Sequence, residues 1–592
     1  MNPMHATVLT DQRFTRTLDD WVVRFSQPHW RGARIEGWLF EGVAARREAE
    51  RQLAAAGVQA QLRSAYKPLV FHFLEEVDTS TLAAVTITYP VHAQASPQRF
   101  LQEAYPLAAL LPQCRLDFVA GGADRHYHLA FTHRDGSTSD ARVRAPNRVH
   151  DDPQGVTHLS PTGWLRVDKP GEATQFDSAQ PTDYELVFAQ ILSTVGTHDW
   201  PAQEPYFERL DIRVDLPGIE QRLPVEHETI SSFEALHEDI YFSLLEVFQR
   251  RSGRPAQDRR LQPGQIVPDV RASRHAPRLR ITHRLFDKQA QELCAQGLPD
   301  SGVPLAELGD PPSPVRIAAG MLALGGQVFE AVSRQGRTVS GLYHAGTSTP
   351  VLISGGQHAN ETSGVVGALR AAELLQASAG AHFALIALEN PDGYALHREL
   401  RAQHAHHMHH AARYSALGDD IEYRETAPFF EREARQKGLT ISGAQLHINL
   451  HGYPAHEWTR PWSGYVPRGF ELWTIPKGFF LVLRYQPGWQ AEAHALHERV
   501  SAALASVPGL ADFNARQMAL YERHAGPIPF AVRDGIAYTV TEVDRPGAPV
   551  TLITEYPDET VDGDAFRLAH TVQMRTVLAA VAAWQSLARV MP

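Results

Sequence analysis

The stretch 351–364, VLISGGQHANETSG, places two reactive side chains directly after a buried strand. Its apolar start predicts a strand that ends at the two glycines, and the alanines and leucines of 365–377 predict the helix that follows. His358 and Glu361 therefore lie at the carboxyl end of a strand, where open α/β sheets place their ligands. Side chains three apart on a helical turn share one face, so an imidazole nitrogen and a carboxylate oxygen can bind one zinc ion. The pattern also fits an exposed loop histidine and a glutamate favoured by the helix dipole.

The second half of the chain alternates apolar strands with helices, which predicts an α/β fold. We expect a mostly parallel or mixed sheet that helices cover on both faces. Further strands are expected at 382–388 and 445–451 and twice within 536–556, and further helices at 491–505 and 565–589.

The first half predicts a different organisation, an α+β and β-rich region without a chemical motif. Short strands are expected at Leu69–Leu74 and Ala83–Tyr89, and a long helix at Ser232–Arg250. The domain prediction is an α+β domain at 1–115, a β-rich domain ending in the helix at 116–275, a linker at 276–300 and the α/β domain at 301–592.

Composition excludes some classes of protein. The chain of 592 residues carries a formal net charge of −11, which argues against nucleic acid as a partner. No run of eighteen apolar residues could span a membrane, and the N-terminus has no basic start followed by an apolar core. Cys114 and Cys294 form no metal or redox motif and favour a reducing compartment, so we expect a cytoplasmic protein.

A catalytic zinc needs a third protein ligand, which should come from another strand end. The predicted strand LHINLHGYP offers His447 and His451 on one face. His451 is favoured because it lies at the strand end beside Gly452, while His447, deeper in the strand, fits a hydrogen-bonded core residue better.

Hydrolysis at a zinc ion also needs a general base, and two glutamates in strand context are candidates. Glu555 ends an apolar strand just before the last helix, whereas Glu542 lies in an arm of a hairpin. We therefore favour Glu555, although an acid at a strand end in solvent is the common case.

These residues together resemble the zinc carboxypeptidases, the M14-type metallocarboxypeptidase family. The matching features are HxxE after a glycine turn, the NPDG turn at 390–393, the His-Gly-Tyr at 451–453 and Thr554-Glu555 near the C-terminus, in the family's order. The resemblance covers about residues 300–592 and nothing before them.

The resemblance implies a role for each matching residue. His358, Glu361 and His451 would bind one Zn²⁺ per chain, and Glu555 would act as the base. An arginine after NPDG would stabilise the oxyanion, and Arg401 is preferred to Arg398 for this role. The remaining implied residues bind substrate: Arg413 in place of the family's Asn-Arg pair, Asn390, and Tyr538 or Tyr521 as the active-site tyrosine.

The implied activity is removal of a C-terminal amino acid from a peptide. Two alternatives stay open. One is an amidase or deacylase of the aspartoacylase and succinylglutamate desuccinylase type, which acts on an acyl-amino acid, because HANE also fits that group. The other is a binding protein that keeps the fold without turnover.

Two further stretches have open interpretations. The tract HAHHMHH at 404–410 fits a solvated helical stretch or a wall of the cleft. The aromatic residues after the third ligand fit either a substrate pocket or the core; they are Trp458, Trp462, Tyr465 and Trp473.

Overall fold

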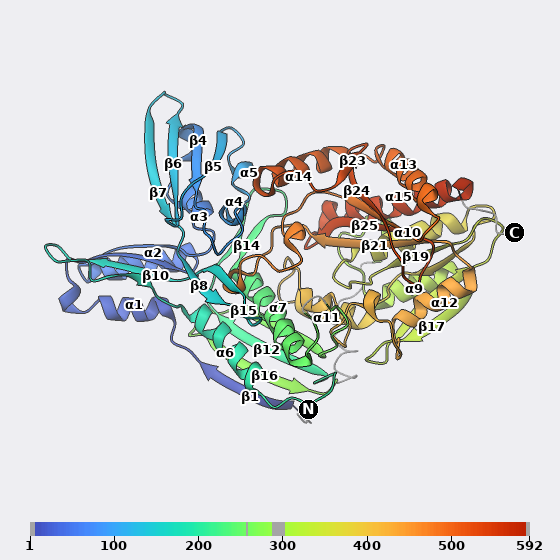
Figure 1. Ribbon diagram of the computed structural model, residues 1–592, viewed down its shortest axis with the longest axis horizontal. Coiled ribbons are helices and arrows are strands. Elements are labelled where there is room, and N and C mark those ends of the chain that lie inside the picture. The colour runs from blue at the N-terminus through green and yellow to red at the C-terminus, as the bar shows by residue number, and fades with distance from the viewer. Residues whose placement is uncertain (1–5, 256–257, 287–301, 588–592) are drawn as a thin grey trace.

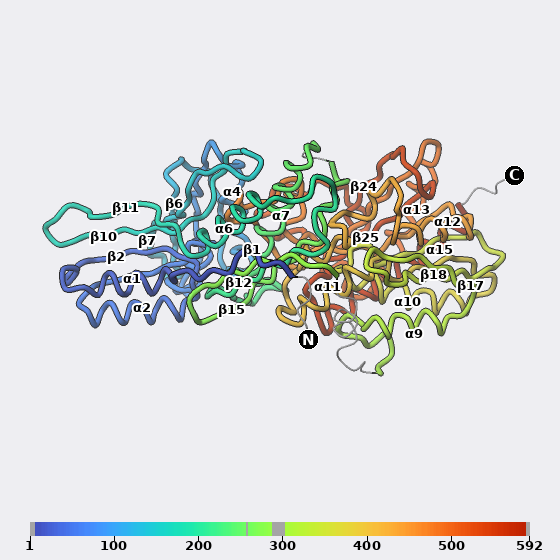
Figure 2. The backbone as a smooth tube through the Cα atoms, turned by 90° about the horizontal axis from the view of Figure 1, so that it is seen from below, coloured from blue at the N-terminus to red at the C-terminus, as the bar shows by residue number. Residues whose placement is uncertain are grey.

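The computed structural model describes residues 6–255, 258–286 and 302–587. Elements from the first half of the chain gather on one side of the molecule and the large sheet of the second half on the other (Figures 1 and 2).

The second half contains a nine-stranded mixed sheet in the order β17-β18-β20-β19-β21-β25-β22-β24-β23. Its four central strands, β20, β19, β21 and β25, are parallel to their neighbours in this group, and antiparallel pairs flank them. The strands are β17 (Gln327–Val332), β18 (Thr338–His344), β19 (Val351–Gly355), β20 (Phe383–Ile386), β21 (Leu446–Pro454), β22 (Phe480–Tyr485), β23 (Ala531–Arg533), β24 (Ile536–Glu542) and β25 (Val550–Glu559). The expected strands at 382–388 and 445–451 and the two within 536–556 are confirmed.

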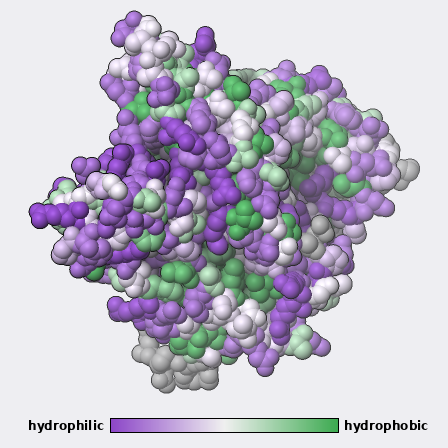
Figure 3. Space-filling view, turned by 60° about the vertical axis from the view of Figure 1, so that its left-hand side comes forward, coloured by the Kyte–Doolittle hydropathy of each residue, from purple (hydrophilic) through white to green (hydrophobic). Residues whose placement is uncertain are grey.

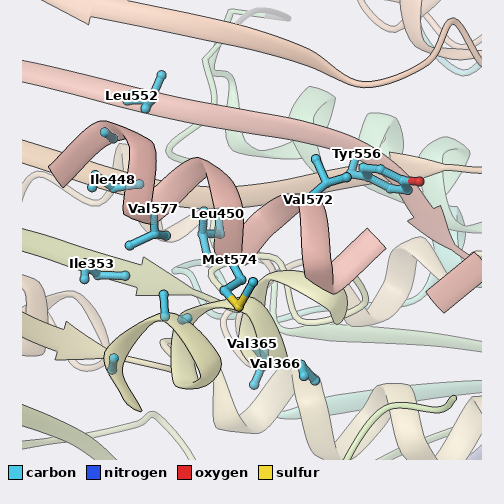
Figure 4. Close-up of a cluster of buried hydrophobic side chains, with 14 of the residues drawn as sticks. Ile353, Val365, Val366, Ile448, Leu450, Leu552, Tyr556, Val572, Met574 and Val577 are labelled. Atoms are coloured by element: carbon cyan, nitrogen blue, oxygen red, sulfur yellow. The ribbon is translucent and has the colours of Figure 1, made fainter. Parts of the chain in front are cut away.

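Helices cover both faces of this sheet. Helices α10, α13 and α15 enclose the larger core with Ile353, Leu450 and Leu552 (Figure 4). Helix α12 packs on the other face, where Leu352 and Ile386 are buried with it. The helices of this half are α9 (Pro314–Leu324), α10 (Ser363–Gln376), α11 (Pro391–Arg401), α12 (Arg432–Ser442), α13 (Gln490–Leu504), α14 (Leu510–Ala525) and α15 (Gly563–Leu587).

The first half forms three four-stranded sheets, β1-β16-β12-β15, β11-β10-β2-β3 and β5-β4-β6-β7, and two hairpins, β8-β9 and β13-β14. The strands are β1 (Ala6–Arg13), β2 (Arg34–Leu39), β3 (Gln59–Ser64), β4 (Leu82–Tyr89), β5 (Arg115–Ala120), β6 (His126–His133), β7 (Thr138–Arg144), β8 (Asn147–Asp151), β9 (Thr157–Pro161), β10 (Trp164–Asp168), β11 (Phe176–Ala179), β12 (Arg209–Leu216), β13 (Glu220–Arg222), β14 (Thr229–Ser231), β15 (Gln265–Ala272) and β16 (Arg278–Arg284). The helices are α1 (Thr17–Phe25), α2 (Val43–Ala55), α3 (Pro68–Glu75), α4 (Arg99–Glu103), α5 (Leu107–Leu110), α6 (Asp183–Thr197) and α7 (Ser232–Ser252).

Some expectations for the first half are corrected. Residues 69–74 belong to helix α3, whose first residue Pro68 suits the first helical position, and not to a strand. The expected linker at 276–300 contains strand β16, which pairs with β1 and β12, while 287–301 lie outside the described residues. The boundary expected at residue 115 cuts through one sheet, because β4 pairs with β5.

None of the described helices is long and apolar enough to cross a membrane. The face in Figure 3 is mainly hydrophilic, with smaller hydrophobic patches between the polar residues.

Helix α7 joins the two halves of the chain through buried charges. It begins after Ser231, whose Oγ accepts a hydrogen bond from the Glu234 amide at 3.1 Å. The Glu234 carboxylate then accepts from His456 Nε2 at 2.7 Å, and farther along the helix Glu246 binds Arg460 at 2.7 Å. A buried pair leaves an uncompensated charge when one partner is removed, so this contact is sensitive to single substitutions.

Replacing Glu234 with glutamine should lower the free energy of unfolding by about 3–5 kcal/mol, because buried His456 loses its counter-charge. Burial lowers the pKa of His456, but Glu234 and its neighbours outweigh burial and raise it to about 9. A raised pKa stabilises the fold fully below about pH 6.5, the unfolded value, and the contribution disappears as pH rises through about 9. Urea unfolding at pH 7 and pH 10 measures both effects. Glu498→Gln removes an exposed pair with Arg533 and should cost at most about 1 kcal/mol; an equal cost for both variants would contradict the expectation.

Candidate metal centre and active-site cavity

The first two candidate ligands lie in the turn between β19 and α10. Strand β19 ends at Gly355, and helix α10 begins at Ser363, so His358 and Glu361 occupy the connection at the carboxyl end of the strand. Gly364 packs against β21 so closely that a Cβ there would lie 2.9 Å from the Leu450 carbonyl oxygen. This close approach packs the start of helix α10 against β21.

Three donor atoms converge at this place. The His358 and His451 Nδ1 atoms lie 3.0 Å apart, and they lie 2.8 and 3.0 Å from the two carboxylate oxygens of Glu361. All three side chains are buried. Among the described residues, this is the one group of three or more histidine, cysteine, aspartate or glutamate side chains that lie close enough together to hold a metal ion. Two histidines and one carboxylate are a donor set that suits a catalytic zinc, so the residues present fit the metal that the resemblance implies.

Neighbouring groups orient these donors. The backbone N–H of Gly452 donates to Glu361 Oε2 at 3.0 Å, and Asp420 Oδ2 lies 3.4 Å from His358 Nε2. Gln357 donates to the other oxygen of Asp420 at 3.1 Å. A carboxylate on the far ring nitrogen is the usual partner of a metal-binding histidine.

The charges of the cluster favour an ionised carboxylate. Burial alone raises the pKa of Glu361, but His358, Arg413 and His451 together hold it well below its usual value. Burial lowers the pKa of His358 and Arg413 lowers it further, yet Glu361 and Asp420 raise it to about 9.

Glu555 lies beside the cluster on the neighbouring strand. It is the register partner of His451 across the parallel pair β21 and β25, so both side chains point to the same face of the sheet. Burial and then Glu361 raise the pKa of Glu555 well above its usual value, against Arg413, His358 and Lys477.

A cavity of about 300 Å³ opens over this face. Ligand pockets are commonly of this size or larger. Its wall includes His358, His451, Glu555 and Arg413, together with residues that sequence reasoning did not single out, among them Arg259, Asp420, Tyr423, Phe470 and Arg484. Arg259 comes from the first half of the chain, so both halves line this cavity.

Arg413 is the arginine that touches the cluster. Its Nη1 forms an ion pair with Glu361 and lies 3.9 Å from Glu559. Helix α11 carries Arg401 to another place, where it binds Asp310 at 2.9 Å, and Arg398 donates to the Pro312 carbonyl. The structure therefore brings Arg413, and not Arg401, to the cavity.

Other candidate residues lie elsewhere. Asn390 caps helix α11 by accepting from the Gly393 amide at 2.9 Å, and it does not line the cavity. Tyr538 faces the larger core, because its strand pairs it with buried Leu481, and it stacks on His497 with ring centroids 3.7 Å apart. Tyr521 is buried beside Lys477, whose Nζ lies 5.6 Å from its ring centroid.

The competing candidates for ligand and base also lie apart from the cluster. His447 is buried deeper in β21, with its Nε2 2.7 Å from Ser354 Oγ. Glu542 is exposed at the end of β24.

The histidine tract is not a solvated helical stretch. His407, His409 and His410 are buried, and His410 Nδ1 lies 2.7 Å from the Glu238 carboxylate of α7. His410 lines the cavity, as do Trp458 and Trp473, whereas Trp462 and Tyr465 do not. The acid that pairs with buried His410, Glu238, comes from the first half of the chain, about 170 residues earlier along the sequence.

The sequence matches no protein-family model and no curated protein. Solved structures similar to this chain include a metallo-carboxypeptidase from Pseudomonas aeruginosa in complex with (2-guanidinoethylmercapto)succinic acid, with 14% identity, a TM-score of 0.30 and coverage of 53% of this chain and 72% of that one. A metallo-carboxypeptidase from Burkholderia cenocepacia has 15% identity, a TM-score of 0.30 and coverage of 53% and 76%. Bovine thrombin-activatable fibrinolysis inhibitor in complex with tick carboxypeptidase inhibitor has 13% identity, a TM-score of 0.26 and coverage of 45% and 94%.

Proposed function

We propose that this protein is a zinc-dependent hydrolase that removes a C-terminal amino acid from a peptide, and that residues 302–587 form its catalytic unit. The observation that carries the proposal is the convergence of His358, Glu361 and His451 beside a cavity large enough for a substrate, whose wall includes His358, His451 and Glu555. A zinc ion held by these three side chains would supply Lewis acidity, which polarises a carbonyl group and makes water more acidic.

The protein's own residues would then complete the reaction. Glu555 takes a proton from the attacking water as the water oxygen bonds to the scissile carbonyl carbon. The same carboxyl group gives that proton to the amide nitrogen as the carbon–nitrogen bond breaks, so the products are a shortened peptide acid and a free amino acid. Arg413, fixed beside Glu361, stabilises the negative charge that develops on the carbonyl oxygen.

Two further cations of the cavity wall favour a substrate with a free carboxylate over a neutral amide. Arg259 donates to the Tyr423 hydroxyl at 3.3 Å and forms no ion pair with a described carboxylate. Arg484 approaches Glu422 only at 4.0 Å. Guanidinium groups of this kind can bind a carboxylate through two hydrogen bonds.

Metal removal tests the proposal. The purified protein is incubated with a mixture of peptides, their C-terminal amides and N-acyl amino acids, and the products are identified by mass spectrometry. We expect loss of single C-terminal residues from the free-acid peptides only, no turnover after chelation, and recovery when zinc is restored. Turnover that persists without metal would refute the zinc mechanism. Equal cleavage of the amides would favour the amidase alternative.

A further inference from the structure

A second cavity of about 280 Å³ adjoins the first one. The two cavities share Arg259, Asp420, Gly469 and Phe470 as wall residues. Much of the second wall comes from helix α7 and from residues 258–261, which belong to the first half of the chain. The first half thus builds a space that continues from the candidate active site.

Apart from Arg259, which lies on the wall shared with the first cavity, the charged side chains of the second wall have partners within the protein. The ion pairs are Glu246 with Arg460 at 2.7 Å, Asp258 with Arg260 at 2.8 Å and Asp419 with Arg424 at 2.6 Å. Because these charges are neutralised in place, they offer little to attract a further ion.

Five of the other side chains on this wall are apolar or aromatic. Phe242, Leu245, Leu261, Tyr414 and Phe470 line it. The Phe242 and Phe470 rings lie 5.5 Å apart, centroid to centroid. The wall is therefore suited to an aliphatic or aromatic group.

Aromatic contacts connect this wall to the first cavity. Phe242 stacks on Trp458 with centroids 5.7 Å apart, and Trp458 lies on the wall of the first cavity. On its sheet side the first cavity adjoins another cavity, with Asn449, Arg484 and Ile553 on the shared wall. A substrate whose free carboxylate lies at Arg484 would extend its acyl side toward the second cavity, away from the sheet.

We propose that the second cavity binds the acyl side of the substrate, and that it selects a large aliphatic or aromatic side chain on the residue just before the cleaved bond. The inference rests on the proposed function and adds the substrate class. The space is sufficient, since an apolar cavity of about 150 Å³ accommodates benzene. A single methylene group in an apolar pocket changes kcat/KM by about 10–200-fold.

Kinetics on N-acetyl dipeptides test the inference. The leaving residue is kept constant, and the residue before the bond is glycine, alanine, leucine or phenylalanine. We expect kcat/KM for phenylalanine to exceed that for glycine at least about tenfold. Leu245→Asp should reduce this ratio at least fivefold, because a carboxylate in the cavity disfavours an apolar group.

Val247→Asp is the matched control, since Val247 is half-buried on the same helix but lines a different cavity. Val247→Asp should keep the wild-type ratio of kcat/KM between the phenylalanine and glycine substrates. A wild-type enzyme that cleaves all four substrates at similar rates would overturn the inference while supporting the proposed function. An unchanged ratio in Leu245→Asp would also overturn it.

Binding of the acyl product gives a measurement independent of turnover. In titration calorimetry we expect N-acetylphenylalanine to bind wild type at least tenfold more tightly than N-acetylglycine, and Leu245→Asp to lose the difference. Equal affinities in wild type would overturn the inference. If the preference appears but no peptide is cleaved, the cavity is supported and the hydrolase proposal fails.

Discussion

Glu555→Gln should lower kcat by about 10²–10⁴-fold, because the amide cannot accept the proton that a general base must take. Metal content should stay at the wild-type value, since Glu555 is not one of the three converging donors. KM should change little, because the side chain keeps its shape and the lost interaction belongs to the transition state. Steady-state kinetics on a free-acid peptide, with zinc measured on the same samples, gives all three quantities.

Glu542→Gln is the matched control for this variant. Glu542 lies on β24 of the same sheet, separated from β25 by β22, and it is exposed and outside the cavity. It should retain wild-type kcat within twofold. A Glu555→Gln enzyme as fast as wild type would exclude Glu555 as the base, and a large loss in Glu542→Gln would point to that residue instead.

His451→Ala should release the metal and abolish hydrolysis. Removal of a supporting residue near a metal costs about 10–100-fold in affinity, and loss of one of three ligands should cost more. We expect about one zinc per wild-type chain after dialysis and close to none in the variant, by elemental analysis, with circular dichroism unchanged. The metal is lost because only two of its three protein ligands, His358 and Glu361, remain in the variant.

His447→Ala provides the comparison on the same strand. His447 points to the same face as His451 but contacts Ser354, so its variant should keep its zinc. The ligand assignment fails if His451→Ala retains stoichiometric zinc, or if His447→Ala loses it.

Local patterns predicted the parts of the site that lie at strand ends. His358 and Glu361 follow β19, while His451 and Glu555 lie in the carboxyl-terminal halves of β21 and β25, and parallel strands bring these positions to one edge of the sheet. The sequence order of these strands differs from their order in the sheet, but the ends still meet.

Residues on helices and long loops were harder to place. Spacing after the NPDG turn favours Arg401, yet the face of helix α11 that holds Arg401 turns toward Asp310. Arg413 reaches the cluster from a loop whose path depends on buried contacts with α7. No local pattern encodes those contacts.

Contacts between distant segments account for most of the remaining differences between the predicted and the observed elements. Strand β16 pairs with β1 across about 270 residues. Its own sequence is rich in arginine and lies beside prolines, and a local pattern could not reveal a partner so far away. Residues 69–74 form a short apolar run, and such runs fit helix and strand equally well. Arg259, Phe242 and Leu245 line the cavities only because the two halves pack together.

Helix α7 limits how such a protein can diverge in evolution. Most of its side chains are buried, and two of its acids hold the second half of the chain in place, so few positions on it can vary without loss of the fold. Leu245 is half-buried and faces the second cavity without carrying a charge contact. Related proteins with different preferences would therefore be expected to differ at this position while they keep Glu234 and Glu246.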